Sequence, residues 1–356
     1  MEIEEIRRLS KEEIFRRIEK IKDELGKDLV ILAHYYQNDD IVRWADFQGD
    51  SLKLAQYAAS QEDANYIVFC SVNFMAEMAR LLAKPYQKVL HPEFKAKCPL
   101  AEMADVKKVK KAWSELNEII RDDVIPITYV NSTVELKAFC GENDGLVCTS
   151  ANAPNVFKWE LAKNKKIFFF PDENLGTNTS LKLGFRREEI LTWEPNKIYG
   201  GNSEKQIKDS RIFLWKGFCY VHLVFTPFHV EEVKEKYKDI KVIVHPECFP
   251  EVCALSDSVG STSFIKKTVE QAPPGSSWAI GTEWNLVNRL KNENIDKFII
   301  PLAESRCSQM AKINLENFLF TLESILTGRL VGEVIISEEI KNWAEISLRR
   351  MLEIKI

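Results

Sequence analysis

Short runs of β-branched and aromatic residues alternate with helical stretches along almost all of this 356-residue chain. Alternation of this kind is typical of βαβ units, which build parallel sheets with helices packed on their faces. The pattern predicts strands over residues 29–33, 66–69, 88–90, 127–130, 146–147, 167–170, 212–215, 241–244, 258–259, 278–280 and 298–302. We therefore expect an α/β fold with short parallel sheets.

A helix is predicted before the first strand. Ser10 and Glu13 form a capping-box pair at its start, and Gly26 is suited to be its C-cap. Apolar residues recur between them at helical spacing, at Ile14, Ile18, Ile21 and Leu25.

The predicted strands group into three similar segments. A chain of this length exceeds what one hydrophobic core usually organises, so two or three domains are expected. We predict an N-terminal helix over residues 1–27, three α/β domains over 28–105, 106–222 and 223–310, and C-terminal helices over 311–356.

Polar and aromatic turns follow the predicted strands in each segment. Examples are His34 and Tyr36 in the first segment, Tyr129 in the second, and His245 and Glu247 in the third. Ligands bind beyond the carboxyl ends of parallel strands, so these turns form one common site if the three edges converge. Helix capping explains any single turn of this kind. It does not explain why imidazole and aromatic groups recur beside the caps.

Composition and charge limit the class of partner. Hydrophobic residues make up 45% of the chain and charged residues 29%, as in an ordinary globular protein. A net charge of −4 and the lack of a long basic run argue against broad nucleic-acid binding. No apolar run approaches the roughly 20 residues that span a bilayer, and residues 1–20 lack the features of a secretory signal. We expect a cytoplasmic protein that acts on a small molecule, with no nucleic-acid or membrane partner.

The eight cysteines differ in where they fall in the pattern. None forms a CxxC, so the sequence supports neither a zinc ribbon nor a thioredoxin-like site. Cys70 and Cys148 end apolar strands and suit a packing role, and Cys140, Cys248 and Cys253 are ordinary helix or loop positions.

Three other cysteines each close one of the repeated segments: Cys98, Cys219 and Cys307. Three thiolates can hold zinc with one open position, or three irons of a [4Fe–4S] cluster with the fourth iron free. Their spacing alone does not decide between the two.

Eight motifs lie in order along the chain: Ala33-His34-Tyr35-Tyr36-Gln37, Ala45-Asp46-Phe47-Gln48-Gly49-Asp50-Ser51, Asn73-Phe74-Met75-Ala76-Glu77, Tyr129-Val130-Asn131-Ser132, Cys148-Thr149-Ser150-Ala151-Asn152-Ala153, Pro171-Asp172-Glu173-Asn174-Leu175-Gly176, His245-Pro246-Glu247-Cys248 and Val259-Gly260-Ser261-Thr262-Ser263. In content and order they resemble the quinolinate synthase family, and the resemblance extends from about residue 30 to residue 327.

The resemblance implies three pseudo-symmetric, three-layer α/β domains arranged as a triangle around a central site. It also implies a [4Fe–4S] cluster held by one cysteine from each domain, at Cys98, Cys219 and Cys307. Three departures stand out. Lys97 replaces a glycine that is usual before the first ligand, and residues 139–145 are longer than in the shortest members of the family. Residues 186–208 are also long, and we expect them to be a surface excursion.

The family condenses iminoaspartate with dihydroxyacetone phosphate to quinolinate, with loss of phosphate and two waters, in de novo NAD (pyridine nucleotide) biosynthesis. The resemblance implies the same transferase-type dehydrating condensation here, with the open iron as Lewis acid. Because the imine hydrolyses readily, it also implies a functional link to an aspartate-oxidising enzyme.

Residue roles follow from the matched motifs. Imidazole, phenol and carboxylate groups cover the pKa range needed for proton transfer, which gives the catalytic candidates His34, Tyr36, Tyr129, His245 and Glu247. The expected substrate-binding residues are His34, Ser51, Tyr129, Asn131, Ser150, His245, Glu247, Ser261 and Thr262.

Each residue also has a structural alternative. Ser51, Ser150 and Thr262 could be simple helix caps. Tyr129 could pack within its strand, and Glu247 could be a solvated turn residue. His222 could orient the cluster loop by hydrogen bonding without touching substrate. Two rival functions differ in class: a metabolite-binding module whose cysteines only pack, and a zinc or iron–sulfur hydro-lyase acting on another small acid.

Overall fold

A computed structural model describes residues 3–121 and 123–354 of the chain. Two compact units are present. The first unit is Met1–Cys98 with Cys307–Ser337, and the second unit is Pro99–Arg306 with Glu338–Ile356. The predicted α/β class is confirmed, because the described residues form three sheets in which every strand pair is parallel. The triangular arrangement and the domain boundaries stay predictions.

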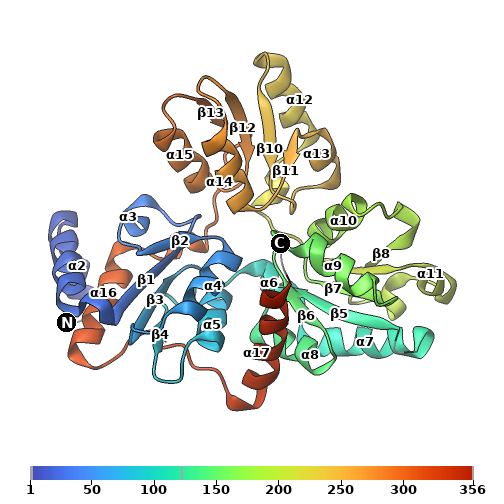
Figure 1. Cartoon of the computed structure of the whole chain (residues 1–356), viewed down its shortest axis with the longest axis horizontal. Coiled ribbons are helices and arrows are strands. Elements are labelled where there is room, and N and C mark those ends of the chain that lie inside the picture. The colour runs from blue at the N-terminus through green and yellow to red at the C-terminus, as the bar shows by residue number, and fades with distance from the viewer. Residues whose placement is uncertain (1–2, 122, 355–356) are drawn as a thin grey trace. The chain divides into compact units, whose positions relative to one another are not determined.

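The first unit is built on a four-stranded sheet with the order β2-β1-β3-β4 (Figure 1). Its strands are β1 (Leu29–His34), β2 (Phe47–Gly49), β3 (Tyr66–Cys70) and β4 (Lys88–Leu90). Its helices are α1 (Ile3–Ile6), α2 (Lys11–Leu25), α3 (Asp39–Val42), α4 (Ser51–Ser60), α5 (Asn73–Leu82) and α16 (Leu315–Thr327). The apolar sides of α2 and α16 pack together on one face of the sheet, and α4 and α5 contact β1 and β3.

The predicted N-terminal helix is confirmed as α2. Ser10 Oγ accepts a hydrogen bond from the N–H of Glu13, and Gly26 takes φ 49° at the other end. Ile14 and Ile18 are buried in the core of the first unit, as their spacing predicts.

The second unit contains two sheets. The five-stranded sheet has the order β6-β5-β7-β9-β8, and the four-stranded sheet has the order β11-β10-β12-β13. The strands are β5 (Val124–Tyr129), β6 (Leu146–Cys148), β7 (Lys166–Phe170), β8 (Ile190–Trp193), β9 (Ile212–Trp215), β10 (Lys241–Val244), β11 (Ser258–Val259), β12 (Ser277–Gly281) and β13 (Phe298–Pro301).

The helices of the second unit are α6 (Pro99–Met103), α7 (Val106–Ile120), α8 (Val134–Glu142), α9 (Ala153–Leu161), α10 (Glu173–Lys182), α11 (Glu204–Asp209), α12 (Pro227–Lys236), α13 (Pro250–Leu255), α14 (Thr262–Gln271), α15 (Trp284–Glu293) and α17 (Glu338–Glu353). None of the helices described is long and apolar enough to cross a membrane.

The two four-stranded sheets share one order, in which the second strand of each segment lies outside the first. The five-stranded sheet repeats this order and adds β8 at its edge. β8 comes from residues 186–208, which we expected to be a surface excursion. That prediction misses a strand that pairs with β9 along its whole length and buries Trp193 to 1% exposure.

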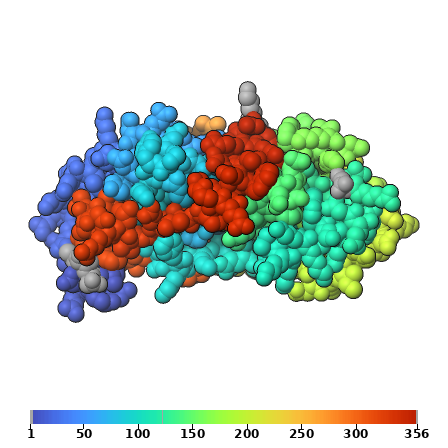
Figure 2. All heavy atoms as spheres, turned by 90° about the horizontal axis from the view of Figure 1, so that it is seen from below, coloured from blue at the N-terminus to red at the C-terminus, as the bar shows by residue number. Residues whose placement is uncertain are grey.

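The C-terminal helix α17 belongs to the second unit, where it packs on α8 and β6. A Cβ atom on Gly141 would lie 2.0 Å from the carbonyl oxygen of Trp343, so only glycine permits this approach. Arg350 Nη1 donates to the carbonyl oxygen of Gly145 at 2.8 Å. Figure 2 shows the dark red atoms of this helix against green atoms of the same unit.

Candidate active site

A phenol and a carboxyl meet where two sheets of the second unit end. Tyr129 is the last residue of β5, and Glu247 lies in the turn after β10. The Tyr129 hydroxyl donates a hydrogen bond of 2.5 Å to Glu247 Oε1. The two side chains are 4% and 2% exposed. Residues 118 positions apart in sequence thus form one buried acid–base pair, at the carboxyl edges where ligands of parallel sheets bind.

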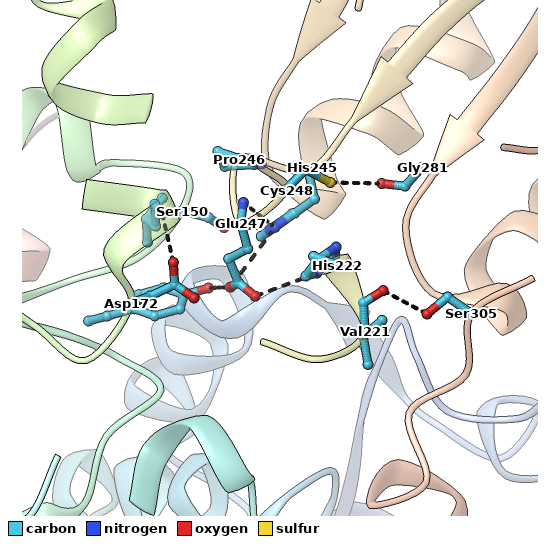
Figure 3. Close-up of polar contacts among 12 residues, drawn as sticks. Ser150, Asp172, Val221, His222, His245, Pro246, Glu247, Cys248, Gly281 and Ser305 are labelled. Carbon is cyan, nitrogen blue, oxygen red and sulfur yellow. Dashed lines mark hydrogen bonds and ion pairs between the residues drawn. The ribbon is translucent and has the colours of Figure 1, made fainter. Parts of the chain in front are cut away.

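Cys219 and His222 approach the same carboxyl from the loop after β9. His222 Nε2 lies 3.5 Å from Glu247 Oε2, and the Cys219 thiol also hydrogen-bonds to Glu247. One donor atom from each of the three residues lies within 4.8 Å of the others, so this set can hold a metal ion. Ser305 Oγ fixes the loop by donating to the carbonyl oxygen of Val221 at 2.6 Å (Figure 3).

His245 completes the cluster. Its ring stacks on that of His222, with 4.3 Å between centroids and 17° between planes. The N–H of Glu247 donates to His245 Nδ1, so Nε2 carries the proton and donates to Ser150 Oγ at 3.2 Å. The structure therefore brings four of the candidate residues of the second unit together, at Tyr129, Ser150, His245 and Glu247.

The turn that carries His245 and Glu247 is held from both sides. His245 N donates to the carbonyl oxygen of Gly281 on β12. Asn178 on α10 donates from Nδ2 to the carbonyl oxygens of Pro246 and Cys248, both at 2.8 Å. These backbone contacts orient the Glu247 side chain toward the cluster.

Burial governs the charge state of the cluster. It raises the pKa of Glu247 to about 7, against the opposing hydrogen bonds from Tyr129 and Cys219. It lowers the pKa of His222 to about 3, so this imidazole is neutral at pH 7. The contact between His222 and Glu247 is therefore a neutral imidazole beside a carboxyl, not an ion pair.

Asp172 is a site residue to which the sequence analysis gave no role. It follows β7 and lies beside Glu247 opposite His222 (Figure 3). Its Oδ1 accepts from Leu175 N at 2.7 Å, and its Oδ2 is buried without a hydrogen-bond partner among the described residues. Burial raises the pKa of Asp172, and the neighbouring Glu247 charge raises it further, because two carboxylates this close repel each other. The signal in the sequence was an acid directly after a strand, in the matched motif Pro171-Asp172.

The capping alternatives are wrong at three positions. The N-cap residues of α4, α9 and α14 are Asp50, Asn152 and Ser261, not Ser51, Ser150 and Thr262. Ser261 itself caps α14, because its Oγ accepts from Phe264 N at 3.3 Å. Thr262 is buried at the start of the same helix, and Asn131 is half-buried after β5. Their substrate contacts stay predictions.

The remaining candidates lie in the first unit. His34 ends β1 and is buried, and the ring of Tyr36 meets it edge-on with 4.7 Å between centroids. The N–H of Tyr36 donates to His34 Nδ1 at 3.1 Å. Ser51 begins α4, with its Oγ 3.9 Å from Met75 Sδ.

The three cysteines selected from the sequence share partial exposure, which is typical of reactive thiols. Cys98, Cys219 and Cys307 are half-buried, and Cys98 and Cys307 belong to the first unit. Four of the others are fully buried, at Cys70, Cys140, Cys148 and Cys248, and burial raises the pKa of each thiol. Cys253 is also partly exposed, although burial of its thiol raises its pKa to about 12.

Carboxyl, imidazole and phenol groups lie together here beside a thiol that can bind a metal. In an α/β protein such a cluster is typical of enzymes that transfer protons on a small polar substrate. Comparison with known proteins narrows this class. The model of the family described as quinolinate synthetase A protein matches residues 16–353. The chain is 42% identical to the quinolinate synthase of Rhodopirellula baltica, across 98% of this chain and 93% of that protein.

Two further relatives agree. Identity to the quinolinate synthase of Acidobacterium capsulatum is 44%, across 95% of this chain and 92% of that protein. Identity to the quinolinate synthase of Bacillus cereus is 43%, across 97% of this chain and 94% of that protein. The chain belongs to the quinolinate synthase family, which confirms the resemblance found in the sequence motifs.

Proposed function

We propose that this protein condenses iminoaspartate with dihydroxyacetone phosphate to quinolinate, for de novo NAD biosynthesis. Family membership supports the proposal. The observation that carries it is the cluster of Tyr129, His222 and Glu247 around Cys219, which joins four positions of the second unit in one buried site.

The reaction needs proton transfer but no oxidant. The pyridine ring forms through one new carbon–carbon and one new carbon–nitrogen bond, and one phosphate and two waters leave. This balances all atoms of the two substrates. Carbon–carbon bond formation and dehydration each require that a proton be taken from one atom and given to another. A group that binds protons reversibly near neutral pH is therefore required.

Glu247 is the proposed general base. Its carboxyl accepts a hydrogen bond from Tyr129 and lies beside neutral His222, so a proton can pass between carboxyl, phenol and imidazole within the cluster. Tyr129 and His245 are further proton carriers of the second unit, and His34 and Tyr36 are those of the first.

Neutral donors are proposed to bind the substrate carboxylates and phosphate. These residues are Ser51, Asn131, Ser150, Ser261 and Thr262. Ser261 and Thr262 lie at the N-terminus of α14, a helix of 10 residues whose dipole favours an anion there.

We propose that Cys98, Cys219 and Cys307 hold a [4Fe–4S] cluster. Their partial exposure fits this role, whereas the fully buried thiols of Cys70 and Cys140 do not. When bound, the cluster would supply one iron without a protein ligand as a Lewis acid for dehydration.

A specific observation favours one rival. Cys219, His222 and Glu247 offer the thiolate, imidazole and carboxylate ligands of a catalytic zinc site with an open position. That arrangement would suit a hydro-lyase that acts on one small acid. The metal content of the purified protein separates the two functions, because a zinc enzyme contains no acid-labile sulfide.

The cellular setting follows from the same chemistry. The eight cysteines are present as thiols and not as disulfides, which suits the reducing cytoplasm in which we propose that the enzyme works. Free iminoaspartate hydrolyses readily, so an aspartate-oxidising enzyme is the proposed source of the substrate.

An anaerobic assay tests the proposed reaction. The purified protein is supplied with dihydroxyacetone phosphate and with iminoaspartate made in place by an aspartate-oxidising enzyme, and quinolinate and phosphate are both measured. We expect equal amounts of the two products. Binding of either substrate without phosphate release would support the binding module instead.

A further inference from the structure

The first unit carries Cys98 and Cys307 on segments that are more than half the chain apart. Cys307 opens a short turn that leads into η5 (Met310–Lys312), and its carbonyl oxygen accepts from Ala311 N at 3.2 Å. Ile313, directly after η5, is fully buried in the core of the unit. The turn after Cys307 is therefore hydrogen-bonded at one end and anchored by apolar packing at the other.

Gln37 holds this turn. It lies after β1 with 0% exposure, and its Nε2 donates to the carbonyl oxygen of Met310 at 3.2 Å. The same nitrogen lies 3.7 Å from Met310 Sδ. Ser71, which follows the adjacent strand β3, places its Oγ 3.7 Å from that sulfur. Ser71 Oγ lies closer to Met75 Sδ, at 2.7 Å, so the main hydrogen bond to the Met310 turn is that of Gln37.

The Cys98 segment is tied to the same framework. Ala96 is buried in the core that contains Ile313, and its carbonyl oxygen accepts from Asn73 N at 2.9 Å. One residue earlier, the carbonyl oxygen of Lys95 accepts from Lys312 Nζ at 2.8 Å. Lys312 therefore connects the segment of one candidate ligand directly to that of the other.

A second buried glutamine, Gln87, shows that a buried amide in this unit does not need a partner far away in the sequence. Buried amides need hydrogen-bond partners wherever they lie. Gln87, also 0% exposed in the first unit, satisfies this need locally, with Gln61, Ala64 and Lys84, at most 26 positions away. Gln37 instead reaches 273 positions along the chain, to the turn that follows Cys307.

We propose that Gln37 and Lys312 are positioning residues that align the Cys98 and Cys307 segments for cluster binding, so that the first unit determines how firmly the cluster is retained. The proposal rests on the proposed function, because it takes both cysteines as ligands. Each residue acts through the segment that carries a ligand. Their substitution therefore changes metal retention more than the chemistry of turnover.

The main experiment compares Gln37→Leu with Gln87→Leu in the full-length protein, reconstituted with iron and sulfide without air. Both changes remove a buried amide of the same unit. Loss of visible absorption in excess iron chelator gives the release rate, and urea unfolding gives the stability of each variant. We expect Gln37→Leu to release iron roughly tenfold faster than the wild-type protein, and Gln87→Leu within about twofold of it. Equal release rates in the two variants would overturn the proposal.

A milder pair covers the case in which Gln37→Leu fails to fold. Lys312 is exposed, so Lys312→Met leaves the core intact. Lys88→Met is the control, because Lys88 Nζ also contacts residues 307–337, the segment that contains Lys312, through an ion pair with Glu333 at 2.7 Å. We expect roughly threefold faster release for Lys312→Met and no change for Lys88→Met.

The outcomes separate the two proposals. A wild-type protein that binds no iron–sulfur cluster refutes the proposed function and, with it, this inference. A wild-type protein that binds the cluster, together with a wild-type release rate for Lys312→Met, refutes the positioning role alone.

Discussion

The two units contribute different chemistry to the proposed reaction. The second unit buries Tyr129, His222 and Glu247 around one thiol, Cys219, in groups that can exchange protons. The first unit presents two thiols on segments fixed by hydrogen bonds, such as those of Gln37 to Met310 and of Lys312 to Lys95. The difference indicates that metal retention and proton transfer are separable, so substitutions of the thiols and of the groups around Glu247 should affect one more than the other.

The largest effect is expected from the ligands themselves. Cys98→Ser, Cys219→Ser or Cys307→Ser should each prevent assembly of a normal cluster, because a serine hydroxyl is a poor substitute for an iron-bound thiolate. Iron content and visible absorption of anaerobic preparations give the answer. Cys70→Ser and Cys140→Ser are the controls and should keep the cluster, since both thiols are fully buried. Full cluster content in Cys307→Ser would exclude it as a ligand.

Glu247→Gln should show the opposite pattern. The amide keeps the shape of the carboxyl but cannot accept a proton, so the cluster should remain while quinolinate formation falls by roughly 10²–10⁴-fold. Glu251→Gln, an exposed glutamate four residues further on, is the matched control and should not change turnover. A loss of less than about threefold at Glu247 would be too small for a general base, and the base would then be sought among His34, Tyr36 and His245.

Gly141→Ala tests the packing of the second unit without touching its site. The new Cβ would meet the carbonyl oxygen of Trp343 at 2.0 Å, so α17 must shift, and a cost of about 1–3 kcal/mol is expected. Urea unfolding measures the loss, and proteolysis near residue 338 should become faster. Glu142→Ala, an exposed change on the same helix, should stay within about 0.5 kcal/mol. Equal stability of the two variants would show that α17 adapts without cost.

A pH dependence of stability is expected in the first unit. Burial lowers the pKa of His91 to about 4, below the ordinary value of 6.5. Between these two pH values the imidazole is protonated in the unfolded chain but not in the folded protein. The free energy of unfolding therefore has its full value above pH 6.5 and decreases as the pH falls toward 4. The loss should be about 2 kcal/mol between pH 7 and pH 5. His91→Gln should flatten this dependence in denaturant titrations, and an unchanged slope would contradict the assignment.

Local patterns predicted most of the fold. Strands rich in β-branched and aromatic residues, such as β9 and β10, were found within a residue of their bounds, and family membership followed from the motifs. Two edge strands were missed. β2 contains only Phe47–Gly49, and β8 lies in an insertion, so both depend on pairing with a neighbouring strand more than on their own composition.

The candidate site was only partly predictable. Tyr129, Ser150, His245 and Glu247 were expected at strand ends, and they do meet in the second unit. Asp172 belongs to the cluster because it is buried beside the charge of Glu247, and no local pattern in the sequence records that proximity. The hydrogen bond from Gln37 to Met310 could not be predicted from the sequence either, because the two residues are 273 positions apart.

Metal and sulfide analysis of wild-type protein purified without air tests the central claim most directly. The proposal predicts about four irons and four sulfides per chain, with the broad visible absorption of a [4Fe–4S] cluster and quinolinate formation that disappears when the cluster is removed. Protein that contains zinc without sulfide, or that forms quinolinate equally well with no iron, would contradict it.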